Sequence, residues 1–350
     1  MRKPLVLHVA EFRNPGGGGF VAGLTRLAQR HHDFETALLC PDDGYSWIQR
    51  LKEAGVRVHV AQRQIEVTAA VARLRPAIVH AHFVSWSLPA TIGATAVRAH
   101  IAWHLHSGIR PGSATKSLTR RLKYAAARRL VDRFYCVSPD IATYLQRFGI
   151  PTAQIVELPN GVDLDRFRPP SLAERVAARR RFGLAPRERA ILFFGRDAFV
   201  KGADRLERAL SSSPSRTRVI AVASSPDTLR ILAGSSLIDV GSLSDVREVL
   251  WAADAIAFPS RSEGVAYSLL EARACGLPAV ASALPGIVRA LSADSGTQII
   301  DAEDSVAFAN ALDRAFERGC VPLSPESAAA LSLDVWADAL AAWYATALAA

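Results

Sequence analysis

Residues 255–282 read AIAFPSRSEGVAYSLLEARACGLPAVAS, and this stretch decides the fold. The apolar run AIAFPS is typical of a strand, and a helix is expected to start near Val265 or Ala266. Gly-Leu-Pro then leads into a second apolar strand, which predicts a parallel βαβ unit. A helix N-terminus attracts anions, yet Glu263 and Glu271 stand on either side of this one. The stretch therefore predicts a parallel sheet and raises the question of what two carboxylates do beside an anion site.

The same alternation runs along the rest of the chain. Short apolar runs alternate with segments of helical periodicity, which predicts parallel sheets of the doubly wound α/β class. The strands are expected at residues 4–10, 34–40, 56–60, 77–82, 100–106, 133–138, 155–159, 189–195, 218–224, 237–241, 255–260, 278–282 and 297–301.

The segment PNGVDLDRFRPPS, residues 159–171, interrupts this alternation. Its prolines and Asn-Gly pair are typical of a linker. We therefore expect two Rossmann-like domains, at 1–165 and 166–325, facing each other across a cleft where the strands end. The last helical stretch, 326–350, has no strand after it and could pack on either domain or cross back to the first.

Composition places the chain among ordinary soluble α/β proteins, with 350 residues, 50% of them apolar and 21% charged. No segment reaches the roughly 18 apolar residues that a membrane span needs. The N-terminal MRKPLVLHVAEFR is expected to form a strand rather than a signal peptide. The four cysteines form no Cys-x-x-Cys pair, which favours reduced thiols and a cytoplasmic location, and the histidines match no metal motif.

The net charge of +9 is concentrated in two basic runs, residues 116–130 and 175–189. The first run contains six basic residues and no acid. A basic surface could contact a membrane, a nucleic acid or an anionic substrate. The alternative is that both runs are solvated helix faces.

A glycine-rich loop, NPGGGGF at residues 14–20, follows the first strand. Its glycines, including Gly18 and Gly19, allow close approach of backbone N–H groups to a ligand. The loop lacks Gly-x-Gly-x-x-Gly spacing and the second strand ends without an acid, so a dinucleotide site is not expected. By itself the loop could be a flexible turn or a phosphate or sugar contact.

Two cations follow the first strand of the second domain. Arg196 and Lys201 stand just beyond its carboxyl end, and such a pair suits a diphosphate, although a surface pair is the alternative. In the opening stretch, the backbone N–H groups of Ala266, Tyr267 and Ser268 would be free for a phosphate. Glu271, taken alone, is expected to be a solvent-facing helical residue.

His104 and His106 end the fifth strand. Side chains alternate along a strand, so these two share a face, and His106 is nearer the carboxyl end. A structural histidine is the usual interpretation, whereas the position at a strand end favours a functional one.

Combined in order, these motifs resemble the retaining glycosyltransferases of family 4, which have the GT-B fold. The resemblance rests on GRDAFVKG, VGSLSDVREVLWAADAIAFPS and EGVAYSLLEARACGLPAVAS, with the family's Glu-seven residues-Glu spacing met by Glu263 and Glu271. YCVSPDIATYL, IVELPNGVDLDRFRPP and the PGGGG loop also look like that family. The resemblance covers nearly the whole chain.

The resemblance implies a nucleoside-diphosphate sugar as co-substrate, without cofactor or metal. Arg196 and Lys201 would hold the diphosphate, together with the backbone N–H groups of Ala266, Tyr267 and Ser268. The glutamates would accept hydrogen bonds, Glu263 from a hydroxyl of the donor sugar and Glu271 from the ribose diol. The remaining positions implied are His106 near the donor sugar, Gly18 and Gly19 at the donor or acceptor, and Leu243 near the base.

The implied activity is transfer of a hexose-type sugar to an acceptor hydroxyl with retention, uridine being the preferred base. The acceptor could be a lipid-linked glycan or a small-molecule hydroxyl, with the basic run 116–130 contacting the inner face of an anionic membrane; no nucleic acid is expected. Alternatives are a GT-B epimerase or phosphorylase and a non-enzymatic nucleotide-sugar or polyanion binder. The sequence departs from the family at Ala266, often Gly or Pro there, and at Ser224-Ser225-Pro226, where a glycine-rich turn is usual.

Overall fold

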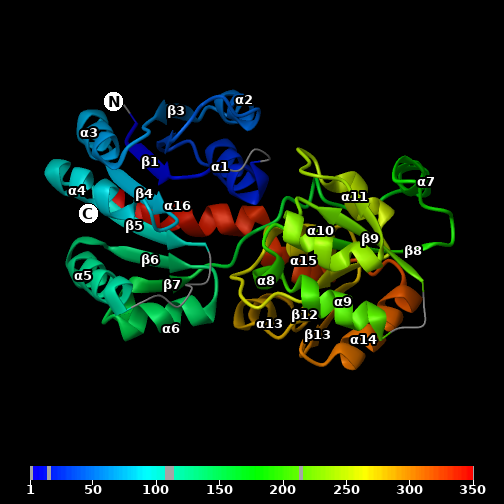
Figure 1. Cartoon of the computed structure of the whole chain (residues 1–350). Coiled ribbons are helices and arrows are strands. Elements are labelled where there is room, and N and C mark those ends of the chain that lie inside the picture. The colour runs from blue at the N-terminus through cyan, green and yellow to red at the C-terminus, as the bar shows by residue number, and fades with distance from the viewer. Residues whose placement is uncertain (1–2, 14–16, 107–113, 213–215, 350) are drawn as a thin grey trace. The chain divides into compact units, whose positions relative to one another are not determined.

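The computed structural model describes residues 3–13, 17–106, 114–212 and 216–349, and side chains within 114–117 are not described. The chain divides into two compact units, Met1–Gly161 with Leu333–Ala350, and Val162–Ser332. Each unit contains one parallel sheet with helices on both faces (Figure 1). The predicted α/β fold class, with two Rossmann-like sheets, is confirmed.

Unit 1 contains a seven-stranded sheet in the order β3-β2-β1-β4-β5-β6-β7, and every strand pair in it is parallel. The elements are β1 (Leu5–Ala10), α1 (Gly18–Arg30), β2 (Glu35–Cys40), α2 (Trp47–Glu53), β3 (Arg57–Val60), α3 (Gln64–Leu74), β4 (Ile78–His82), α4 (Ser87–Val97), β5 (His100–Leu105), α5 (Ala114–Leu130), β6 (Arg133–Cys136), α6 (Pro139–Arg147), β7 (Ile155–Glu157) and α16 (Leu333–Ala349).

Unit 2 contains a six-stranded parallel sheet in the order β10-β9-β8-β11-β12-β13. Its elements are α7 (Leu172–Arg181), β8 (Arg189–Phe194), α8 (Ala198–Lys201), α9 (Ala203–Ser211), β9 (Thr217–Val222), α10 (Pro226–Ile231), β10 (Ser236–Asp239), α11 (Arg247–Ala252), β11 (Ala255–Phe258), α12 (Tyr267–Ala274), β12 (Ala279–Ser282), α13 (Pro285–Leu291), β13 (Thr297–Ile300), α14 (Ser305–Arg318) and α15 (Pro325–Leu331).

The strand orders locate where a ligand is expected to bind. In each sheet the chain order reverses beside the first strand of the unit, between β1 and β4 in unit 1 and between β8 and β11 in unit 2. The loops after these strands diverge to opposite faces and leave a crevice at the carboxyl edge of the sheet. Every sequence-predicted site residue after β8 or β11 therefore lies at a topological switch point.

The C-terminal helix α16 belongs to unit 1, where it packs beside α1 and against the sheet (Figure 1). A Cβ atom on Gly23 of α1 would lie 2.9 Å from the indole of Trp336, so the two helices approach closely. Arg30 donates two hydrogen bonds to the carboxylate of Asp338, at 3.1 and 2.9 Å. The predicted boundaries at 165 and 325 differ from the observed ones, because the chain enters unit 2 at Val162 and leaves it at Ser332.

Apolar side chains of both sheets are buried on both faces, as parallel sheets require. In unit 1, Leu7 and Val79 face a cluster formed with α3 to α6, whereas Val6 and Ile78 face the cluster that contains α16. The four cysteines are free thiols, as predicted from their spacing. Within the described residues, no helix combines the length and the apolarity that a membrane span requires.

Candidate active site

The segment after β8 carries the two predicted cations, Arg196 before the short helix α8 and Lys201 at its end. Arg196 is exposed and stands two residues after β8, separated from it by Gly195. Lys201 is the last residue of α8, whose first turn is capped by the Asp197 carboxylate accepting from Val200 N–H at 3.0 Å. Among the described residues no hydrogen bond or ion pair involves Arg196, so its guanidinium is available for a ligand.

Lys201 and Glu263 form an ion pair between the loops that follow β8 and β11. Both side chains are largely buried, with 21% of Lys201 and 15% of Glu263 exposed. The hydroxyl of Ser260 lies 3.5 Å from the same carboxylate, and the ammonium lies 5.5 Å from the ring centre of Phe258. The structure thus joins a cation and a carboxylate that the sequence placed in separate motifs.

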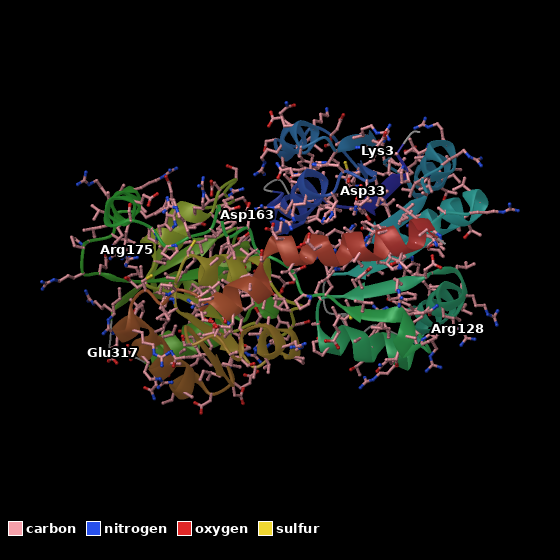
Figure 2. The ribbon with its side chains drawn as sticks, turned by 180° about the vertical axis from the view of Figure 1, so that it is seen from behind. Lys3, Asp33, Arg128, Asp163, Arg175 and Glu317 are labelled. Atoms are coloured by element: carbon pink, nitrogen blue, oxygen red, sulfur yellow. The ribbon has the colours of Figure 1, made fainter. Side chains whose placement is uncertain are left out.

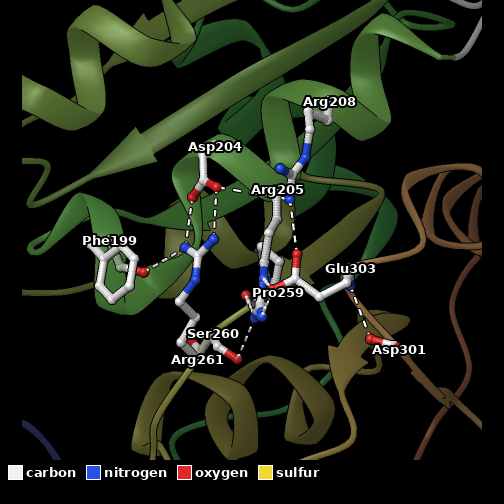
Figure 3. A network of polar contacts seen from close by, with 9 residues as sticks. All are labelled: Phe199, Asp204, Arg205, Arg208, Pro259, Ser260, Arg261, Asp301 and Glu303. Carbon is white, nitrogen blue, oxygen red and sulfur yellow. Dashed lines mark hydrogen bonds and ion pairs between the residues drawn. The ribbon is translucent and has the colours of Figure 1, made fainter.

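An arginine network holds these two loops together (Figure 3). Arg205 of α9 donates to the carbonyl oxygens of Pro259, at 3.0 Å, and Ser260, at 3.3 Å. Arg261 donates to both carboxylate oxygens of Asp204 at 2.7 Å each. Sequence analysis missed these residues, because nothing in the spacing of Asp204 and Arg261 indicates a contact across 57 residues.

Gly202 ends the α8 turn and makes the approach of the two loops possible. Its φ is +73°, and a Cβ atom there would lie 2.2 Å from the carbonyl oxygen of Pro259. No side chain fits that distance, and a positive φ favours glycine independently. The ammonium of Lys201 is therefore held against the end of β11 by a backbone contact that needs glycine.

The N-terminus of α12 has the geometry predicted for anion binding. Ala266 is its extended N-cap residue, at φ −71° and ψ 128°, and its carbonyl oxygen accepts from the N–H groups of Leu269 and Leu270. Tyr267 and Ser268 are the first two helical residues, whose N–H groups have no intrahelical acceptor. Ala266 adopts an ordinary backbone conformation, so the departure from the family's Gly or Pro introduces no strain here.

Glu271 is buried, not solvent-facing as its position in a helix suggested by itself. Only 8% of the residue is exposed, and burial raises the pKa of its carboxyl group to about 7. Arg166 acts in the opposite direction and lowers the pKa, whereas Asp245 raises it further. A buried carboxyl group with a raised pKa is typical of a functional site.

Leu243 follows β10 and is half-buried against the apolar core of unit 2. The turn at Ser224-Ser225-Pro226 packs on the end of β8, where the Ser225 N–H donates to the carbonyl oxygen of Gly195 at 2.9 Å. A Cβ atom on Gly195 would lie 2.5 Å from the Thr228 methyl group. The turn therefore fits closely without the glycines common in the family.

In unit 1, the predicted glycine loop is described from residue 17 onward, and residues 14–16 lie outside the described part. Gly18 and Gly19 form the first turn of α1, with Gly18 exposed and Gly19 buried. Gly17 before them has φ +70°, and a Cβ atom there would lie 2.9 Å from Trp47. The helix N-terminus is therefore at the carboxyl end of β1, as predicted.

His106 follows β5 by one residue and is half-buried, while Ser107 and Gly108 of the same motif lie outside the described residues. Burial lowers the pKa of its imidazole to about 4, although hydrogen bonding to Asn160 raises it. The ring belongs to a cluster that the sequence did not predict. The other members are His8 of β1, His80 and His82 of β4, and His104 of β5.

The first basic run, residues 116–130, forms most of α5, with the side chain of Lys116 outside the described part. Arg121, Arg128 and Arg129 are exposed, whereas Arg120 is half-buried; Figure 2 labels Arg128 on α5. Lys123 instead donates to the carbonyl oxygen of Val84 at 2.7 Å, and burial lowers its pKa to about 8. Leu118 and Leu122 are 60% and 65% exposed on the same helix.

The second basic run, residues 175–189, is partly structural. Arg175 and Arg179 both pair with Asp254, at 2.5 and 3.2 Å, and donate to backbone carbonyl groups around the end of α11. Arg179 is buried. These two arginines therefore hold α7 against the end of α11 within unit 2. They do not form a solvated or ligand-facing surface.

Comparison with known proteins agrees with the fold. The family profile described as Glycosyltransferase Family 4 matches residues 24–166, and the profile described as Glycosyl transferases group 1 matches residues 188–318. The D-inositol 3-phosphate glycosyltransferase of Mycobacterium sp. (strain KMS) is 35% identical over 172 residues, which are 45% of this chain and 38% of that protein. The aligned region thus spans well under half of that relative.

Solved structures share the fold over almost the whole chain. Alr3699/HepE of Anabaena, solved in complex with UDP-glucose, has a TM-score of 0.84 at 19% identity, covering 98% of this chain and 100% of that one. Sucrose-phosphate synthase from Thermosynechococcus elongatus has a TM-score of 0.78 at 19% identity, covering 99% and 100%. The two parallel doubly wound units thus define a protein of the GT-B fold. The chain belongs to the glycosyltransferases of family 4, which confirms the resemblance seen in its motifs.

Proposed function

We propose that the protein is an active glycosyltransferase that moves a hexose-type sugar from a nucleoside-diphosphate donor to an acceptor hydroxyl with retention. The observation that carries this proposal is the contact of Lys201 with Glu263 at the β8–β11 switch point. A diphosphate needs cations and backbone N–H groups, and a sugar needs a hydrogen-bond acceptor. Both requirements are met at this one edge of the sheet.

In the proposed reaction, the glycosidic bond to the β-phosphate breaks and negative charge develops on the leaving diphosphate. Lys201, the exposed Arg196 and the N–H groups of Tyr267 and Ser268 stabilise that charge. A leaving diphosphate oxygen takes the proton of the acceptor hydroxyl, which attacks from the same face of the sugar. Because positive side chains and a helix N-terminus stabilise the negative charge of the leaving diphosphate, the proposed reaction needs no metal ion.

The glutamates address hydroxyl groups in this proposal. Glu263 accepts from a hydroxyl of the donor sugar, and Glu271 accepts from the ribose diol, with Leu243 near the base. The roles that the family resemblance implies for His106, near the donor sugar, and for Gly18 and Gly19, at the donor or acceptor, belong to the same proposal. UDP is the preferred nucleotide, supported by the UDP-glucose complex of the Anabaena protein.

The acceptor is an alcohol, and the candidates are a small phosphorylated polyol and a lipid-linked glycan. The name of the mycobacterial relative supports the first candidate. For the second, we propose that α5 contacts anionic lipid, because the exposed Leu118 and Leu122 stand beside surface arginines. Sedimentation with phosphatidylglycerol vesicles should decrease with salt and in Leu122→Asp, and salt-insensitive or absent binding would contradict the contact.

The function is tested by thermal stabilisation with UDP, GDP and ADP, followed by NMR of the products from a panel of donors and acceptors. Stabilisation by one nucleotide, with transfer and an anomeric configuration equal to that of the donor, is expected. An inverted product would contradict retention, and an epimerised donor would support the epimerase alternative. Nucleotide binding with neither hydrolysis nor transfer would identify a non-enzymatic binder. Activity that requires added Mg²⁺ and is lost with EDTA would contradict metal independence.

A further inference from the structure

The helical turn that carries Lys201 is too short to be stable by itself. α8 has only four residues, and a single turn gains too few hydrogen bonds to offset the cost of ordering its backbone. Its N-terminal end is capped by the Asp197 carboxylate. At its C-terminal end, the carbonyl groups of Phe199 and Val200 have no donors from inside the turn. The orientation of Lys201 therefore depends on groups outside α8 that bind these carbonyl oxygens.

Arg261, in the loop after β11, donates to both of these carbonyl groups. Its backbone N–H donates to the carbonyl oxygen of Val200 at 2.8 Å, and its Nη1 donates to that of Phe199 at 2.9 Å. The guanidinium also lies over the aromatic ring of Phe199, 4.4 Å from the ring centre. A cation is favourable at the C-terminus of a helix. Arg261 therefore closes the end of the α8 turn with its main chain and its side chain together.

Asp204 of α9 fixes the direction of this guanidinium (Figure 3). Nη1 and Nη2 of Arg261 donate to the two carboxylate oxygens of Asp204 at 2.7 Å each, and such a bidentate pair orients the planar group. The other N–H of Nη1 then points to the carbonyl oxygen of Phe199. Only 19% of the Arg261 side chain is exposed. The guanidinium is thus held by acceptors of the protein and leaves little of its surface for a ligand.

Arg261 also stands two residues before Glu263 in the same loop. One residue thus joins the turn that ends in Lys201 to the loop that carries its ion-pair partner. The loop has a second attachment to α9, because Arg205 donates to the carbonyl oxygens of the two residues that precede Arg261. Loss of the Arg261 side chain should therefore release the α8 turn without detaching the loop from unit 2.

We propose that Arg261 is a positioning residue that holds the ammonium group of Lys201 against the carboxylate of Glu263. Asp204 acts behind it by orienting the guanidinium. The consequence for catalysis rests on the proposed function, in which Lys201 stabilises the leaving diphosphate and Glu263 accepts from the donor sugar. The placement of Lys201 does not rest on that function. The alternative is that the arginine network contributes only to the stability of unit 2.

Arg208 offers a matched control in the same network (Figure 3). It lies on α9, where it pairs with the same Asp204, at 3.8 Å, and with Glu303, at 3.1 Å. Within the described residues, its side chain donates to no carbonyl group of the α8 turn or of the loop after β11. Arg208→Ala therefore changes the charge around Asp204 and Glu303 and leaves the contacts of the α8 turn intact.

The placement of Lys201 is measured without an assay of transfer, by acetylation of the full chain with acetic anhydride and mass spectrometry of the lysine peptides. Lys201 is the only lysine between residues 162 and 332, and the exposed Lys52 of α2 is the internal reference. We expect Lys201 to react about 5-fold faster or more, relative to Lys52, in Arg261→Ala, because the released turn opens and exposes the amine. In Arg208→Ala the ratio should equal that of the unmodified protein.

A second variant keeps this test decisive if Arg261→Ala fails to fold. Asp204→Ala removes the carboxylate that orients the guanidinium, from a half-buried position in the first turn of α9 where alanine is a good helix former. It should accelerate the labelling of Lys201 in the same direction. Unchanged labelling in Arg261→Ala, or in Asp204→Ala where Arg261→Ala is unfolded, would overturn the positioning role. Equal acceleration in Arg208→Ala would overturn it as well.

The kinetic arm uses the best donor. We expect kcat to fall about 10-fold in Arg261→Ala with a donor KM changed by less than about 3-fold, because misplacement of Lys201 weakens leaving-group stabilisation more than nucleotide binding. Arg261→Lys, which keeps a cation without the planar fork, should recover part of the loss, and Arg208→Ala should lose nothing.

A double-mutant cycle tests whether Arg261 acts through Lys201. In the Lys201→Ala protein, adding Arg261→Ala should change kcat little further. Additive losses, or a loss in Arg208→Ala equal to that in Arg261→Ala, would overturn the catalytic consequence. Absence of transfer in the unmodified protein would instead remove the proposed function, and the labelling result would still stand.

Discussion

The ammonium group of Lys201 contacts the carboxylate of Glu263, although 62 residues separate them in the chain. The contact joins the first turn after β8 to the loop after β11. Before a ligand binds, each charge therefore compensates the other in a largely buried position. A diphosphate sugar would offer Lys201 an anion and Glu263 a hydroxyl, so both groups would keep a partner in the complex.

Replacement of either partner should remove transfer. We expect Lys201→Ala and Glu263→Gln to lower kcat/KM by about 100-fold or more, because stabilisation of the leaving group or of the sugar is lost. Initial rates with the best donor measure this. Arg314→Ala, which removes an exposed cation of α14, is the control. Full activity in both site variants would contradict the assignment.

Glu271 should make nucleotide binding depend on pH. Its pKa in the folded protein is about 7, above the ordinary 4.5, so it is largely protonated at pH 6 and ionised at pH 8. The ribose diol needs an acceptor, and we therefore expect the UDP Kd to decrease from pH 6 to pH 8. Glu271→Gln is the matched control, because the diphosphate itself titrates equally in both proteins. The same pH dependence in Glu271→Gln would assign it to the ligand.

The same carboxyl group should reduce stability at high pH. A raised pKa means that the folded state binds the proton more tightly than the unfolded state, so stability falls as the pH rises from about 4.5 through about 7. Glu271→Gln should therefore raise the free energy of unfolding at pH 8, by up to roughly 3 kcal/mol, and leave it similar at pH 4.5. Urea unfolding at both pH values measures this. Equal effects at the two pH values would contradict the shift.

Gly202→Ala should be far more destabilising than Gly183→Ala. Both glycines have a positive φ, but a Cβ atom on Gly202 would meet the Pro259 carbonyl oxygen at 2.2 Å, whereas none of the described atoms lies within 4 Å of a Cβ atom on Gly183. We expect a loss of about 1 kcal/mol for Gly183→Ala and at least about 3 kcal/mol for Gly202→Ala. Urea unfolding midpoints test this, and equal losses would mean that the close approach is absent.

Arg273 should be essential for the stability of unit 2. Fully buried in α12, it pairs with both carboxylate oxygens of Asp294 and donates to the carbonyl oxygens of Leu277 and Val321. Arg273→Met should cost about 3–5 kcal/mol, because Asp294 is left buried and unpaired, and Arg273→Met with Asp294→Asn should recover part of the loss. Arg230→Met, in an exposed pair, is the control. Similar urea midpoints for the two Arg→Met variants would contradict this role.

Periodicity was sufficient to predict the strands and the parallel sheets, because alternation of strand and helix is a local property. The stretch from Ala255 to Ser282 illustrates this, since its strand, loop, helix and second strand appear in the structure within a few residues of the predicted limits. The boundary after residue 165 was less accurate. The linker composition extends over residues 159–171 and does not show where in that segment unit 2 begins. The backbone bridge between Val162 and Ser332, which places Val162 in unit 2, is seen only in the structure.

In the candidate site, too, the features set by local sequence could be predicted and those set by tertiary contacts could not. The cations Arg196 and Lys201 and the helix N-terminus followed from their positions at strand ends. The burial of Glu271 did not, because helical spacing alone does not show which elements cover a face. The arginine network around Pro259 and the contacts of His82 with His8 and His106 also required the fold, although His80-x-His82 and His104-x-His106 on neighbouring strands were a usable signal.

The sequence by itself therefore determined the GT-B architecture, the family and the edge of each sheet where chemistry is expected. These depend on the order of short motifs, and each motif is set by a few neighbouring residues. Only the tertiary structure decided that Lys201 pairs with Glu263, that Glu271 is buried and that the imidazoles of His8, His82 and His106 lie within hydrogen-bond distance of one another. Those properties depend on dielectric surroundings and on distances of about 3 Å between residues far apart in the chain, which packing alone determines.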